Sequence, residues 1–359
     1  MKRYMSALML VVAAVLGASA QQTKMLTAEK ANEYGIIYSL PVTQLTVEAD
    51  CQVTTWVPGP YMQYAKRYLG GGEVVTQRRS SVALGDVSLQ TGGVASDKKY
   101  LMQLKAGALT EVCVSSDGMI LAINTQAQEP EPFEPGDGIS GEKEPDIDEY
   151  LQYVDADYLS SLSSAKRAEM LAQTIMEIRE SRLALSRGTA ETMPTDGRQL
   201  ELMLQSLETQ EKALTRAFTG YSYTVTQTRH WTLTPDSLML QDRQTLFRLS
   251  DTEGFVDADD YSGEPVYLTL QLVQTPEMPL DAKGEPKAFP KDGVAYALPG
   301  TASVAVTYKD RQVTSGQFDF AQYGLVYGLD PKLFSDKKAP SMATFDPATG
   351  ALLRLETVR

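Results

Sequence analysis

The chain has 359 residues, a formal net charge of −13 at pH 7 and 43% hydrophobic residues. This hydrophobic content is ordinary for a globular protein and can fill a core, and the length predicts roughly two to three domains of about 100–200 residues each. The acidic balance argues against a nucleic-acid-binding protein, because phosphate contacts need clustered Lys and Arg.

The first twenty residues are typical of a signal peptide. Lys2 and Arg3 supply the positive start, and an apolar run follows from Met5 to Leu16. The small residues of Ala18-Ser19-Ala20 match the pattern that precedes cleavage. The run is shorter than the roughly 20 residues of a membrane span. We therefore expect an exported protein of the periplasm, or one associated with the outer membrane or cell surface, with no transmembrane segment in the mature chain.

Residues 21–128 have the composition of a β-domain. The stretch from Ile36 to Val47 is rich in β-branched and aromatic residues, which favour strands. Further along, two short apolar runs flank Asp117-Gly118, a pair that supplies the positive φ of a tight turn. Cys51 and Cys113 both lie in this region. In an oxidising compartment a disulfide between them and two separate buried thiols both fit the sequence.

An acidic, proline-rich segment follows at 129–157. It carries eleven carboxylates, opposed only by Lys143, and four prolines that block regular structure. This composition predicts a solvated, extended linker. A calcium site is the alternative, although the spacing does not match an EF-hand loop.

Residues 158–220 change to a helical pattern. Apolar residues recur there at steps of three and four in two successive stretches, as in amphipathic helices. Gly188 and Gly220 stand where helices often end, and Pro194 and Gly197 punctuate the connection. We expect an antiparallel two-helix hairpin.

From 221 to 359 the pattern of strands returns, which predicts a C-terminal β-domain. Its end resembles a hairpin in which Gly350 occupies the left-handed position of a bulged turn. The whole chain is therefore expected to be α+β and mostly β.

The two β regions also resemble each other. Gly35–Pro41 matches Gly293–Pro299, and the later segments Tyr61–Gly70 and Phe320–Gly328 both carry tyrosines. Each copy then closes on a strand, a turn with glycine and a second strand. These matches occur in the same order, so we expect two related β-domains with the helical hairpin inserted between them.

Segments spread over nearly the whole mature chain resemble a family of uncharacterised secreted proteins from Gram-negative anaerobes, catalogued as domain of unknown function 4831. The matching segments are Tyr34–Pro41, Pro60–Gly70, Met193–Gly220, Phe247–Val266 and Phe345–Gly350. The resemblance implies no activity and carries no functional residues over to this chain.

The sequence offers no catalytic residue and no metal site. His230 is the single histidine, and no nucleophile motif surrounds it, so we interpret it as an ordinary strand residue. With one histidine and two separated cysteines, a zinc site is not expected, and no cofactor is expected either.

Two groups of residues are candidate ligand contacts. The first is an aromatic set spaced for one helical face, which fits either packing against a sheet or binding of sugars and peptides. The second is an acidic stretch that fits either a solvated turn or a site for calcium or carbohydrate hydroxyls. Their members are Tyr61, Tyr64 and Tyr68, and Asp251, Asp257, Asp259 and Asp260.

The leading functional hypothesis is a non-enzymatic cell-envelope protein that binds or scaffolds other envelope components, with envelope proteins or glycans as partners. A hydrolase that uses carboxylates to cleave glycans or peptides is the second hypothesis. A calcium-stabilised, adhesin-like module is the third.

Overall fold

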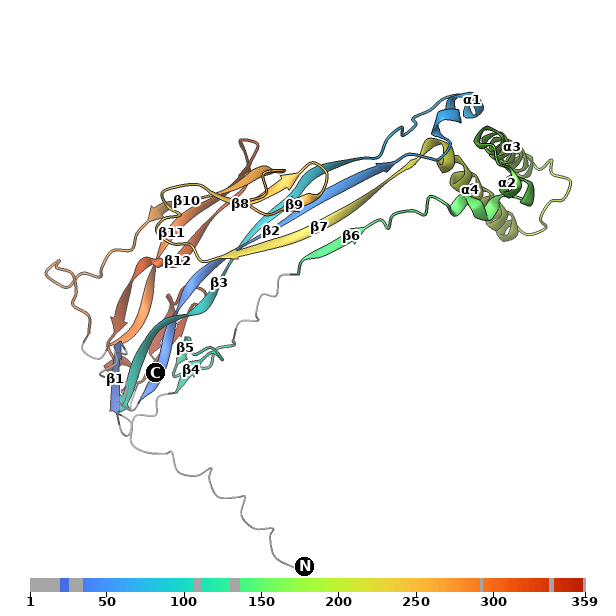
Figure 1. The fold of residues 1–359 in the computed structure, drawn as a ribbon. Coiled ribbons are helices and arrows are strands. Elements are labelled where there is room, and N and C mark those ends of the chain that lie inside the picture. Colours follow the sequence, from blue (N-terminus) through green and yellow to red (C-terminus); the bar gives the residue numbers. More distant parts are fainter. Residues whose placement is uncertain are drawn as a thin grey trace, which may run out of the picture.

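The computed structural model describes residues 20–25, 35–105, 111–129, 136–290, 293–335 and 339–357. They form an elongated molecule with a β body at one end and a helical head at the other (Figure 1). The prediction of a mostly β protein is confirmed, since 46% of the chain is strand and 22% is helix, with several antiparallel sheets. The predicted signal peptide lies outside the described residues except for Ala20.

The longest strands belong to the first sheet. Its order is β1 (Ala20–Met25), β3 (Arg79–Lys105), β2 (Ile36–Val57), β7 (Tyr221–Leu233) and β6 (Gly138–Gly141). At about 3.3 Å per residue, the 22 residues of β2 span about 70 Å. Strands β2, β3 and β7 run from the body to the head (Figure 1).

A second sheet packs face to face on the first. Its order is β12 (Arg311–Leu329), β11 (Val294–Tyr308), β10 (Glu264–Gln274), β8 (Gln244–Ser250) and β9 (Gly254–Val256). Alternate residues of β2, from Leu45 to Val53, point into the shared core, as the period of a strand requires. Trp231 stacks on Phe247 across this core with ring centroids 4.1 Å apart.

A third, smaller sheet closes the end of the body remote from the head (Figure 1). Its order is β14 (Leu352–Thr357), β13 (Ser341–Phe345), β5 (Ile120–Ile123) and β4 (Val112–Val114). The short helix α5 (Lys332–Ser335) lies beside β13. A second core forms here, in which Tyr38, Met102, Ile120, Phe334 and Phe345 are buried together.

Strands from both predicted β-domains share one sheet and one core. Strand β7 pairs with β2 from Leu45↔Leu233 to Val57↔Tyr221. The predicted boundaries at 128 and 220 therefore separate segments that are neighbours in space. The matched segments Tyr61–Gly70 and Phe320–Gly328 are not structural equivalents, because the first is helical and the second lies in β12.

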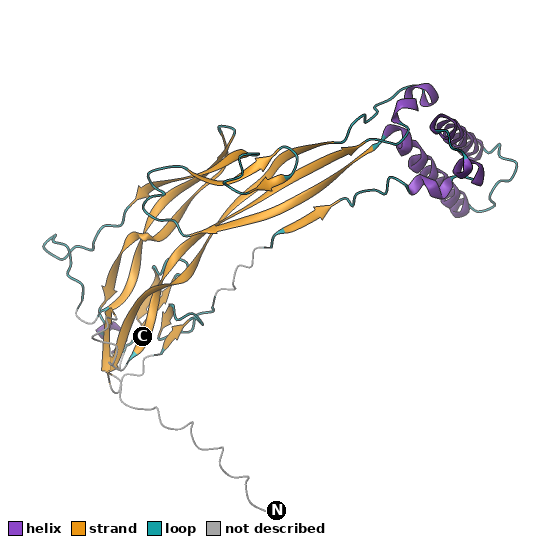
Figure 2. Ribbon diagram, in the orientation of Figure 1, coloured by secondary structure: helices purple, strands orange, loops and turns teal. Residues whose placement is uncertain are grey.

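The head consists of helices, which Figure 2 shows gathered at the end of the long strands. It contains η2 (Met62–Tyr64), α1 (Ala65–Leu69), η3 (Glu149–Tyr153), α2 (Ala156–Ser160), α3 (Ser164–Arg187) and α4 (Gly197–Thr219). Ser163 and Asp196 cap the N-termini of α3 and α4 by accepting backbone N–H groups. Gly188 ends α3 in the left-handed conformation.

The acidic segment is more structured than the predicted linker. Residues 138–141 form β6, which pairs with β7, and residues 149–153 form η3. Two aromatic side chains hold this segment in place. Tyr150, within the acidic segment, and Tyr158, directly after it, are both buried in the core of the head. Acidic composition alone does not reveal these anchors.

Candidate functional site

The three candidate tyrosines belong to the interior of the head. Tyr61 is buried, and its hydroxyl lies 2.6 Å from the hydroxyl of Tyr158. Tyr64 and Tyr68 are half-buried, with ring centroids 6.4 Å apart, and Tyr68 also meets Phe218 edge-on. The geometry therefore favours the packing interpretation of these side chains over an open aromatic face.

The four candidate aspartates lie apart from the tyrosines, in turns around β9 of the body (Figure 1). Asp251, Asp257, Asp259 and Asp260 are all exposed. The carboxylate of Asp260 accepts the backbone N–H of Ser262 at 2.9 Å, and this bonding lowers the pKa of Asp260. Within the described ranges, no group of three or more His, Cys, Asp or Glu side chains is arranged to hold a metal ion.

The two cysteines occupy different sheets. Cys51 is buried in the core between the two large sheets, and Cys113 lies in β4 of the small sheet. Both are free thiols. His230 lies in β7, where its Nδ1 is 2.9 Å from the carboxylate of Asp137.

A groove of about 810 Å³ lies where the head meets the long strands. Helices α3 and α4 form two of its walls, and the start of β7 and the loop after β6 complete it. Its charged lining residues are Glu142, Lys143, Arg179, Arg182, Glu208, Glu211, Lys212 and Arg216. This groove is not among the sites predicted from the sequence. Arg179 and Arg182, three residues apart on one helical face, are the signal that points to it.

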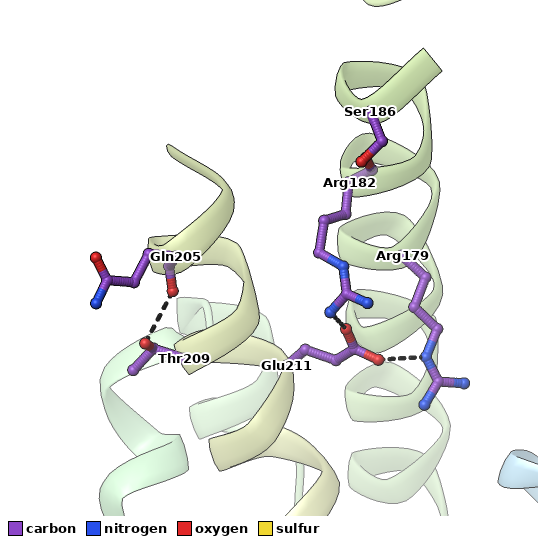
Figure 3. A network of polar contacts seen from close by, with 6 residues as sticks. All are labelled: Arg179, Arg182, Ser186, Gln205, Thr209 and Glu211. Carbon is purple, nitrogen blue, oxygen red and sulfur yellow. Dashed lines mark hydrogen bonds and ion pairs between the residues drawn. The ribbon is translucent and has the colours of Figure 1, made fainter. Parts of the chain in front are cut away.

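Glu211 organises the wall between the two long helices. Its carboxylate accepts the Nε–H of Arg179 at 2.7 Å and an Nη–H of Arg182 (Figure 3). The Glu211 side chain is only 15% exposed, whereas each arginine is 41% exposed. One carboxylate therefore fixes two guanidinium groups at the rim of the groove.

The groove differs in charge from the rest of the chain. Five of its lining side chains are cationic and three are acidic, which leaves a formal excess of two positive charges in a chain whose net charge is −13. Arg216 is paired with Glu149 of η3 at 3.4 Å. Lys143 and Lys212 are exposed and form no ion pair with any residue that the structure describes.

The outer surface of the head carries several exposed apolar side chains. They are Met176 and Leu183 of α3, Met193 of the connection, and Leu202 and Met203 of α4. The first part of α4 thus buries little of its apolar surface within the chain. No helix in the described part of the chain is long and apolar enough to cross a membrane.

Comparison with known proteins gives one match. A family model described as Domain of unknown function (DUF4831) matches residues 34–353. No curated protein and no solved structure matches the chain.

Proposed function

The chain belongs to the DUF4831 family, whose description assigns no activity, and on that premise we propose that it is a non-enzymatic binding or scaffold protein of the bacterial cell envelope. The β body and long strands act as a stalk, and the helical head presents a surface to partner proteins or glycans. The export signal expected at residues 1–20 supports the location.

The observation that carries this proposal is the continuity of the strands with the head. Strands β2 and β3 leave the shared core of the body and reach the helices (Figure 1). In the same sheet, β7 lies between β2 and β6. Long paired strands hold their ends at a fixed separation, because each backbone group is tied to its neighbour. The head is thereby held away from the body.

An internal duplication is part of the proposal. The amide of Ser39 donates to the carbonyl of Gly118 at 2.9 Å, and that of Ala297 donates to Gly350 at the same distance. These residues occupy matching places in the two sequence copies. The matching tyrosines Tyr38 and Tyr296 each pair across their sheet with another tyrosine, Tyr100 and Tyr327 respectively. We interpret both pairs of contacts as support for two related β-units.

The α3–α4 pair is proposed as an antiparallel hairpin that forms the contact surface. Single exposed apolar residues are common on proteins. Here Leu183, Leu202 and Met203 are 48%, 57% and 39% exposed on the two long helices of the head. Apolar side chains at such a position favour a protein partner.

The test is a crosslinked pull-down from intact cells with the tagged full chain. Leu183→Gln, Leu202→Gln and Met203→Gln together should abolish capture of the partner. The matched control replaces Leu272, Val273 and Leu353 of the body, which are 42%, 54% and 65% exposed, and should leave capture unchanged. Deleting the helices would be a poorer test, because it would uncover Tyr61 and Tyr150. Equal capture by both variants would contradict the proposal.

A further inference from the structure

We propose that the groove at the base of the head binds a small polyanion that carries phosphate or carboxylate groups. This inference is independent of the scaffold proposal, because it concerns the groove between α3, α4 and β7 and not the outer surface of the head.

The Glu211 network carries an excess of positive charge. Two guanidinium groups beside one carboxylate leave one positive charge without compensation. Placing Arg179 and Arg182 this close also costs repulsion, which a second anion in the groove would relieve. Such an arrangement is a ready-made contact for an external phosphate or carboxylate.

Arg179 and Arg182 also supply hydrogen-bond donors to the groove. A guanidinium group offers five N–H donors in a planar fork. Within the described part of the chain, Arg179 and Arg182 each give one donor to Glu211 and none to another side chain. Figure 3 shows both guanidinium groups meeting the Glu211 carboxylate from α3. Their other N–H groups can bond an anion bidentately, which gives the strongest class of hydrogen bond in proteins.

Lys143, in the loop after β6, and Lys212, on α4, also line the groove. Because both are exposed and lack an ion-pair partner among the described residues, their charges are available. Arg216 is already paired with Glu149, so it adds positive charge to the groove but is not the main contact of the ligand. Four cations on three separate segments would surround the ligand.

The size and polarity of the groove also suit a small, charged ligand. A volume of about 810 Å³ falls within the range of roughly 300–1,000 Å³ that small-molecule sites have. Thr215, Thr219 and Ser222 add hydroxyl groups to the lining, and among the described residues no Leu, Ile, Val or Met lines it. A short, hydrophilic molecule with two or three negative groups fits this lining better than an apolar ligand.

Isothermal titration calorimetry with two probes at low salt tests the proposal. Tripolyphosphate carries phosphate groups and trigalacturonate carries carboxylates, while neutral maltotriose is the uncharged comparison. Binding of either anion, with none of maltotriose, supports the site, and the better probe identifies its chemistry. Absence of binding by both anions at millimolar concentration would overturn the proposal.

Two variants with opposite expected effects make the test specific. Lys143→Gln with Lys212→Gln breaks no ion pair in the described chain and should weaken binding about tenfold, the effect of losing roughly one charged hydrogen bond. Glu211→Gln removes the competing negative charge but keeps an oxygen that accepts from the arginines. It should strengthen binding several-fold.

The matched control is Lys283→Gln with Lys287→Gln, which changes the net charge by the same amount at exposed positions of the body. Its affinity should equal that of the wild type. An equal loss in both lysine pairs would show that bulk charge, and not the groove, governs binding, and would overturn the proposal. Circular dichroism at 222 nm confirms that the helices of each variant are intact.

Discussion

Within the head, a pair of buried hydroxyls joins segments that are distant in sequence. Tyr61 and Tyr158 are buried, and their hydroxyl oxygens lie 2.6 Å apart, while Tyr150 accepts from Tyr158 at 3.4 Å. Tyr158→Phe leaves the Tyr61 hydroxyl buried without this partner, so we expect a loss of about 1–3 kcal/mol in the free energy of unfolding of the head. Urea unfolding followed at 222 nm measures it. Tyr64→Phe, at a half-buried ring, should change the same free energy by less than about 0.5 kcal/mol.

The buried thiol of Cys51 should make the free energy of unfolding depend on pH. Burial raises the pKa of its thiol to about 11, whereas a cysteine in an unfolded chain ionises near pH 8.5. Between about pH 9 and 11 the folded state thus keeps a proton that the unfolded state loses, and the free energy of unfolding falls as pH rises. Cys51→Ala should have a shallower fall between pH 9 and 10.5 in urea titrations. Cys113→Ala is the control, and identical slopes in wild type and Cys51→Ala would refute this.

At the scale of elements, the junction between α4 and β7 has little room. Gly220 ends α4 with a φ of +73°, and a Cβ there would collide with the carbonyl oxygen of Val57 and approach Val75 at 3.0 Å. Gly188 ends α3 with a φ of +69°, but a Cβ there meets nothing within 4 Å. Gly188→Ala should therefore cost only the backbone strain of about 1 kcal/mol. Gly220→Ala should cost several kcal/mol more, because helix and strand must separate.

Thermal unfolding at 222 nm distinguishes the two glycine variants. Gly188→Ala should lower the Tm by a few degrees, and Gly220→Ala should lower it far more or detach the head from the stalk. Digestion with a protease in the second case should release a fragment cut near residue 220. Equal shifts in the two variants would mean that strain alone, without the close approach to Val57, sets the cost.

The elements differ in how far the sequence predicts them. The apolar steps and the glycine caps predict α3 and α4, because a helix is decided by contacts between near neighbours. The pairing of β7 with β2 joins residues about 180 positions apart. Alternation shows which residues face a core but not which strand lies alongside. The groove could not be predicted from the sequence for the same reason. The spacing of Arg179 and Arg182 places them on one face of α3, but only the tertiary packing brings that face against Glu211.

For the whole molecule, the long strands predict an extended shape in solution. A compact chain of 359 residues would have a radius of gyration of about 21 Å. The 22 residues of β2 alone span about 70 Å, and the head lies beyond their end (Figure 1). Small-angle X-ray scattering should therefore give a radius of gyration at least about a third larger than the compact value.

The scattering experiment needs one control, because a dimer would also raise the radius of gyration. The forward scattering gives the molecular mass, which should stay at that of one chain, 39.3 kDa for the full sequence, across a concentration series. A monomer with a radius near 21 Å would mean that the head folds back on the body. The stalk would then have no spacing role, and the scaffold proposal would lose the observation on which it rests. An extended monomer leaves the head free to meet a partner at a distance from the body.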